Sequence, residues 1–193
     1  MVTQDGIFLK ETTHASELSL VIQLVAASVG TSYLLIFLPN VETITLAIFF
    51  YGYSFTARFS FKALVATLAV WEIVANLSWG FSVIAFPFKF LGWLLIYILG
   101  MASHRFSLDK PLEFAAIGAV GTLVWDLVAT LSTAVVLSTS VNEFLAVYFT
   151  SLILGIPFTI VHVTSNTYLF FMFPYLLKSV VPHLKGKYPQ YLR

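Results

Sequence analysis

The sequence contains no cysteine and has very few charged residues. The absence of cysteine excludes disulfides, iron–sulfur clusters and cysteine-based zinc sites. Only 10% of the 193 residues are charged, whereas a soluble domain has about 25%. The hydrophobic share, 59%, is larger than a buried core requires. We therefore expect an all-α integral membrane protein that crosses the plasma (cell) membrane several times.

The chain also lacks the short motifs of several enzyme and cofactor classes. It has no GxxxxGK[ST] loop, no GxGD or HExxH motif and no serine elbow. An intramembrane enzyme that used Glu72 and Asp126 as an acid pair would therefore lack a recognisable motif. We expect no enzymatic activity, no cofactor and no nucleic-acid partner. We also expect no metal, because the four histidines do not have metal-site spacing; they are His14, His104, His162 and His183.

Apolar runs divide the chain into six predicted membrane spans with short loops. A span needs about 20 mostly apolar residues. The runs cover residues 18–38, 42–57, 61–103 (two spans), 112–138 and 143–180. They predict a membrane domain over 18–180, an N-terminal cytosolic tail over 1–17 and a basic cytosolic tail over 181–193.

Lysine and arginine indicate the orientation of these spans. Six spans place both termini on one side, and nine of the ten basic residues then fall on that side. Only Lys89 lies opposite. Because cytoplasmic loops carry the excess of positive charge, both termini are predicted to be cytoplasmic. The outer connections are then the short segments 39–42, 80–89 and 138–143.

Two similar nine-residue segments place acids inside the predicted spans. VWEIVANLS (70–78) and VWDLVATLS (124–132) are identical at six of nine positions. Each carries a carboxylate, Glu72 or Asp126, near mid-depth. An ionised carboxylate there costs about 2.5–3.5 kcal/mol even on lenient insertion scales. We therefore expect both acids to face the bundle interior or a water-filled cavity.

Polar residues at helical spacing accompany these acids on three spans. If the three polar faces converge, they form a polar cavity that opens toward the outer half of the membrane. The alternative is that these side chains only join helices by hydrogen bonds. The three faces consist of Glu72, Asn76 and Trp79; Thr122, Asp126, Thr130 and Thr133; and Thr159, His162 and Asn166.

Several segments together resemble the S component of an energy-coupling factor (ECF) transporter, the membrane subunit that captures a vitamin or related micronutrient. They are LPNVE at the first outer turn, GAVGTLVWDLVATLSTA in the fifth span and GIPFTIVHVTSNTYLFF in the sixth. The first span adds LVAASVGTS, in which Ala26 and Gly30 are four residues apart and allow close helix approach. The resemblance covers roughly residues 18–180.

The resemblance implies a specific role for several residues. Ala26 and Gly30 would dock against the T subunit, which works with separate ATPase subunits, and Asn40 and Glu42 would lie at the gate of a substrate pocket. The substrate would be a vitamin-like small molecule, with thiamine, riboflavin, biotin and a corrinoid all open. The alternatives are a proton-coupled transporter and an accessory subunit of a larger complex. The pocket candidates from the polar faces are Glu72, Asn76, Trp79, Trp125, Asp126, Thr130, His162 and Asn166.

Overall fold

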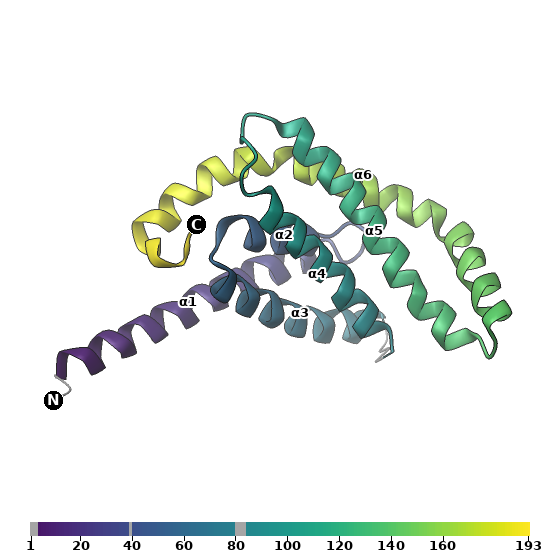
Figure 1. Cartoon of the computed structure of the whole chain (residues 1–193), viewed down its shortest axis with the longest axis horizontal. Coiled ribbons are helices and arrows are strands. Elements are labelled where there is room, and N and C mark those ends of the chain that lie inside the picture. Colours follow the sequence, from purple (N-terminus) through teal and green to yellow (C-terminus); the bar gives the residue numbers. More distant parts are fainter. Residues whose placement is uncertain (1–3, 39, 80–83) are drawn as a thin grey trace.

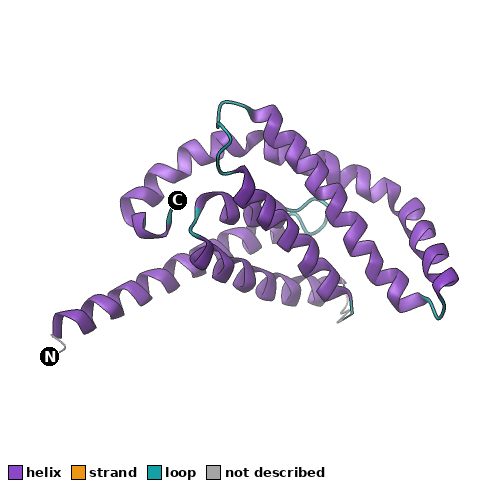
Figure 2. Cartoon of the chain, in the orientation of Figure 1, coloured by secondary structure: helices purple, strands orange, loops and turns teal. Residues whose placement is uncertain are grey.

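The protein is all-α, as predicted. The computed structural model describes residues 4–38, 40–79 and 84–193, with side chains from His14 onward except that of Trp79. Figure 2 shows helices joined by short loops. Within these described ranges the only β pairing is one isolated bridge between Phe55 and Leu192.

Among the described residues, five helices are long and apolar enough to cross a membrane. They expose large apolar side chains such as Leu77, Leu112 and Ile153, and extensive apolar exposure is rare on soluble proteins. The chain is therefore a multi-pass membrane protein by length and composition. The five helices are α1 (Gln4–Leu34), α3 (Ala57–Trp79), α4 (Ala85–Ser103), α5 (Pro111–Leu137) and α6 (Val141–Lys187).

The remaining helix, α2 (Ile44–Ser54), is short and lies in the interior. Its 11 residues span about 16 Å at 1.5 Å per residue, roughly half of a bilayer's apolar core. Nine of the 11 residues are buried. Within the predicted span 42–57, the helix itself is therefore short and belongs to the core. It contacts α3, α4 and α6.

The helices extend further toward both termini than the sequence patterns predicted. Helix α1 begins at Gln4, so most of the predicted tail 1–17 is helical, and this part projects from the bundle in Figure 1. Helix α6 continues to Lys187, and a 3₁₀ turn follows at Pro189–Tyr191. Part of the predicted connection 80–89 belongs to α4, which begins at Ala85.

Helix α6 is one 47-residue helix that contains Pro157, Pro174 and Pro182. It measures about 70 Å along its axis and curves over the bundle in Figure 1, where its first half runs beside α5. Each internal proline removes one helical hydrogen bond and favours bending. The curvature carries α6 from the α5 hairpin back to α2.

An aromatic cluster fixes α2 against α5 and α6. The Phe49 ring lies 4.9 Å from that of Phe170 and 5.2 Å from that of Phe173, centroid to centroid. Phe114 of α5 packs edge-on against Phe49 at 6.2 Å. These four rings are at most 2% exposed, and paired aromatic rings add packing energy beyond their buried area.

A buried tyrosine joins the first three helices. The Tyr51 hydroxyl of α2 lies 2.6 Å from the Ser28 hydroxyl of α1 and 3.1 Å from the Thr67 hydroxyl of α3. It also donates to the Leu24 carbonyl oxygen at 3.1 Å. Hydrogen bonds between helices are worth about 1 kcal/mol in membrane proteins, so this cluster holds α1 on the core through its Ser28 face.

Two glycines allow α2 and α4 to pack with their backbones in contact, which generates a stability prediction. A Cβ atom on Gly100 would overlap the Phe49 carbonyl oxygen, and one on Gly52 would overlap the Tyr97 carbonyl oxygen.

We expect Gly100→Ala to lower the free energy of unfolding by about 1–3 kcal/mol, because overpacking forces a backbone shift. Thermal unfolding in detergent measures this effect. Gly155→Ala is the control, since nothing lies within 4 Å of its Cβ position; equal midpoints for both variants would contradict the close α2–α4 contact.

Candidate functional site

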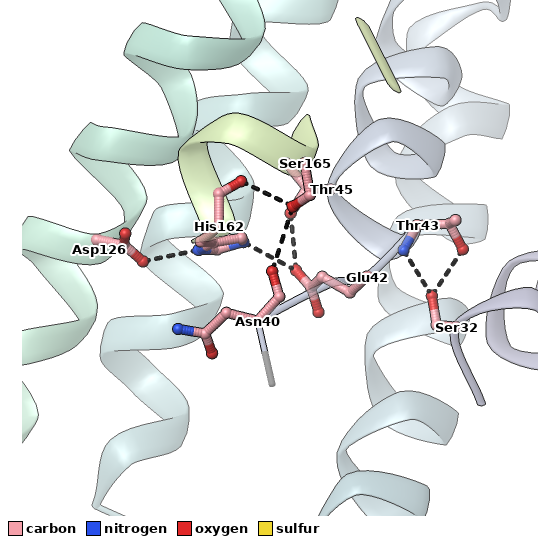
Figure 3. Close-up of polar contacts among 8 residues, drawn as sticks. All are labelled: Ser32, Asn40, Glu42, Thr43, Thr45, Asp126, His162 and Ser165. Atoms are coloured by element: carbon pink, nitrogen blue, oxygen red, sulfur yellow. Dashed lines mark hydrogen bonds and ion pairs between the residues drawn. The ribbon is translucent and has the colours of Figure 1, made fainter. Parts of the chain in front are cut away.

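The loop between α1 and α2 crosses the middle of α6. Asn40 adopts a left-handed backbone conformation with φ 58°, which asparagine tolerates better than most residues. Its carbonyl oxygen accepts a hydrogen bond of 3.3 Å from the Ser165 hydroxyl of α6. On the other side of the loop, the Thr43 amide donates to the Ser32 hydroxyl of α1 at 3.0 Å. Figure 3 shows how these contacts place Glu42 over α6.

His162 of α6 lies between two carboxylates from different elements (Figure 3). Its Nδ1 is 2.8 Å from Oδ1 of Asp126 on α5, and its Nε2 is 3.7 Å from Oε1 of Glu42. The Thr45 hydroxyl donates to the same Glu42 oxygen at 2.8 Å. His162 is 3% exposed. The imidazole therefore joins α5, α6 and the 40–43 loop at one point.

Glu72 has a separate partner, which the sequence patterns did not identify. The Lys89 ammonium of α4 donates to both Glu72 carboxylate oxygens, at 3.4 and 3.3 Å. The Asn76 amide, one turn further along α3, donates to Glu72 at 3.3 Å. The two polar residues of the α3 face thus form one group with Lys89, and this group connects α3 to α4.

Tryptophan rings pack beside the histidine. The Trp125 ring centroid is 5.5 Å from that of His162, with the rings perpendicular, and 5.3 Å from that of Trp93 on α4. Gly92 leaves the space that Trp125 occupies, because a Cβ there would overlap the indole. The tryptophan of the second nine-residue segment therefore belongs to the site.

A cavity of about 240 Å³ lies between these groups. It is larger than the roughly 150 Å³ cavity that admits benzene in a well-studied case. It is formed by the loop, the C-terminal parts of α1 and α3, the N-terminal part of α4 and the middle of α5 and α6. The lining consists of Ser32, Ile36, Leu38, Asn40, Val41, Glu42, Trp71, Ala75, Asn76, Lys89, Trp93, Trp125 and His162.

Several buried polar atoms in and around the cavity have no hydrogen-bond partner among the described residues. The indole N–H groups can only donate, whereas the free Asp126 oxygen accepts when ionised. A buried polar group without a partner costs about 1–3 kcal/mol, so those atoms that belong to the lining residues Trp93, Trp125 and His162 are available to a bound molecule. In and around the cavity, the atoms without a partner among the described residues are Nε1 of Trp93 and Trp125, Oδ2 of Asp126, Nε2 of His162, Oγ1 of Thr122 and both amide atoms of Asn166.

The structure brings most of the predicted site residues together. Two predicted residues, Glu72 and Asp126, lie behind the wall and contact its lining residues Lys89 and His162. Asn166 is fully buried one turn beyond His162. The predicted residues that line the cavity are Asn40, Glu42, Asn76, Trp125 and His162.

Thr130 also lies outside the lining, and several lining residues were missed. The Thr130 hydroxyl donates to the Asp126 carbonyl oxygen of its own helix at 2.7 Å. The side chain of Trp79 lies outside the described residues. Lys89 was assigned to an outer loop. As the one basic residue on the outer side, it could have been recognised as a possible partner for a buried acid. Trp93 was not among the predicted site residues, because neither its burial nor its neighbour Trp125 is visible in a linear pattern.

Comparisons with known proteins add no family to this geometry. No family model, no curated protein and no solved structure matches the chain. Within the described ranges, no group of three or more histidine, aspartate or glutamate side chains is arranged to hold a metal ion. The arrangement therefore has to be interpreted through its own groups: a ring-sized cavity, two indole donors and an imidazole between carboxylates.

The Glu72–Lys89 pair generates a prediction about stability. The side chains are 9% and 29% exposed, and removing one partner of a buried pair leaves an uncompensated charge. We expect Lys89→Met to cost about 1–3 kcal/mol, and the double variant Glu72→Gln/Lys89→Met to recover at least half of the loss. Thermal or denaturant unfolding in detergent measures both.

An exposed ion pair provides the control for these Glu72 and Lys89 variants. Lys110 and Glu113 are 2.7 Å apart with side chains 60% and 43% exposed, so Lys110→Met should change stability by less than about 0.5 kcal/mol. If the double variant is no more stable than Lys89→Met, Glu72 and Lys89 do not compensate each other.

Proposed function

We propose that this chain is the substrate-binding membrane subunit of an ECF-type transporter and captures a vitamin-like small molecule for uptake. The observation that carries the proposal is the cavity of about 240 Å³ whose wall combines tryptophans, His162 and polar groups without partners. Small-molecule sites usually join an apolar lining to a few placed polar groups. The chain has no P-loop, so separate T and ATPase subunits would supply the energy.

The groups around the cavity suggest the chemistry of the ligand. Two indole N–H donors require acceptor atoms on the ligand, and the Glu42 carboxylate, which lines the cavity, can accept from a ligand N–H or O–H. Trp93 and Trp125 offer aromatic contact. A single substituted ring or a compact fused ring with both donors and acceptors fits these conditions and this volume.

The proposed topology is six crossings with both termini cytoplasmic. Nine of ten basic residues then face the cytoplasm, in accordance with the positive-inside tendency. The cavity would open on the outer side, because the loop 40–43 and the start of α4 both lie there. The second crossing would consist of α2 and its flanking segments, surrounded by the other helices.

The proposed docking face lies on α1. Ala26 and Gly30 are exposed, and nothing lies within 4 Å of a Cβ at Gly30. Ser28 and Ser32 are buried on the other side of α1. The small residues of α1 therefore lie on two faces. Ser28 and Ser32 pack against the rest of the bundle, and Ala26 and Gly30 leave the outer face open for close approach by a partner helix.

A second candidate function is a proton-coupled transporter. The observation that favours it is His162 between Asp126 and Glu42 inside the bundle, since ionisable residues within membrane helices often form proton relays. Flux through purified chain in liposomes without any partner, increasing with a proton gradient, would support this candidate over a binding subunit.

The first experiment on the binding proposal is mass spectrometry of small molecules released by denaturing freshly purified protein. A stoichiometric ring compound with donors and acceptors supports the proposal and identifies the substrate. If no compound is released and the chain alone transports protons, the second candidate replaces it.

With the ligand identified, we expect His162→Ala and Asp126→Ala each to weaken binding about tenfold or more, because each leaves a buried partner unsatisfied. Isothermal titration of detergent-purified variants measures the affinity. His183→Ala is the control, since His183 is exposed on the same helix and hydrogen-bonds only to the Ser179 carbonyl among the described residues. Normal binding by both site variants would contradict the pocket assignment.

The docking face has its own prediction. Gly30→Leu should abolish co-purification with the T subunit and uptake, because a large side chain prevents close helix approach. Gly155→Leu is the matched control, as Gly155 also has open space around its Cβ position. Ligand binding should be unchanged in both variants, and equal co-purification would place the interface elsewhere.

A further inference from the structure

A second cavity lies at the opposite end of the bundle, where α2 and α4 end. Its volume is about 270 Å³. Side chains from the end of α4, the last turns of α6 and the C-terminal segment line it. Four of them are basic or can become so: His104, Lys178, Lys185 and Arg193.

The charge of this cavity is only partly compensated. Lys178 pairs with Asp109 at 2.8 Å, and this contact lowers the pKa of the exposed Asp109 carboxyl below its usual value. Lys185 and Arg193 have no acidic partner among the described residues. Their two full charges outweigh the half-charges at the C-terminal ends of α2, α4 and α6, so the cavity favours an anion.

A buried hydroxyl supports a ligand in this cavity independently of the charges. Ser54, the last residue of α2, is 7% exposed and lines the cavity. Within the described ranges its Oγ has no hydrogen-bond partner. The Ser54 carbonyl oxygen accepts from the Arg193 amide at 3.0 Å, which fixes the C-terminal segment at the cavity. The hydroxyl is therefore free to donate to an acceptor inside it.

The rest of the wall is apolar. Leu176 and Val180 of α6, next to the lining, are exposed on the apolar surface. The remaining lining residues are Tyr53, Leu108, Leu177, Val181, Pro182 and Leu192. A free inorganic anion would gain nothing from this part of the wall. A phospholipid would place its phosphate at the cations and Ser54 while its glycerol and acyl chains follow the apolar side.

We propose that this cavity binds the headgroup phosphate of an anionic phospholipid in the leaflet on the basic side of the protein. The site is separate from the cavity at His162 and does not depend on the function proposed there. Lys185 supplies the main charge, Ser54 donates a hydrogen bond to a phosphate oxygen, and α6 provides the apolar wall.

Native mass spectrometry of the whole chain in detergent tests this proposal, with phosphatidylglycerol and phosphatidylcholine of identical acyl chains as probes. We expect phosphatidylglycerol to be retained preferentially, and Lys185→Gln to lower its retention about fivefold. Lys187→Gln is the matched control: it removes the same charge two residues away, where the ammonium lies 5.3 Å from the Tyr188 ring centroid and does not line the cavity.

The outcomes separate a site from general attraction to a basic surface. Equal effects of Lys185→Gln and Lys187→Gln, or equal retention of the two lipids, would overturn the proposal. Displacement of the lipid by millimolar inorganic phosphate would show a phosphate site without lipid selectivity and overturn the lipid assignment. Ser54→Ala, with an unchanged unfolding midpoint, should also reduce retention of phosphatidylglycerol. Full retention would show that the Ser54 hydroxyl does not bind the phosphate.

Discussion

Ionisable side chains inside an apolar bundle need partners from the protein itself, because lipid supplies none. In this chain the constraint is met at two places. Lys89 compensates Glu72 and connects α3 to α4. His162 meets Asp126 and Glu42, and so connects α6 to α5 and to the loop before α2. These contacts between elements far apart in the sequence determine where the helices meet around the cavity.

The loop 40–43 depends on the same interactions. Glu42 is placed over His162 only because Asn40 turns the chain into a left-handed conformation and Ser165 holds its carbonyl oxygen. Beside the histidine, Gly92 of α4 leaves room for the Trp125 ring between α4 and α5. The polar site thus depends on a glycine that lets two helices and an indole pack closely.

The two ends of the bundle differ in chemistry. Near the loop, carboxylates and bases compensate one another inside the protein, and neutral donors such as the indole N–H groups remain available. At the other end, Lys185 and Arg193 have no acidic partner among the described residues and face an apolar wall. The first environment suits a small ring compound, and the second suits an amphipathic anion.

The sequence by itself determined the all-α membrane class, the approximate helices and most of the polar residues of the site. Composition and helical spacing report these properties directly, because an acid in an apolar helix has to face inward. Only the tertiary structure decided that α2 is an interior helix, that Lys89 is the partner of Glu72, and that Trp93 reaches the cavity. Thr130, predicted by the same spacing as Asp126, bonds to its own helix instead. Pairings between helices depend on how the helices rotate and approach one another, and packing sets both, so no spacing along a single helix contains that information.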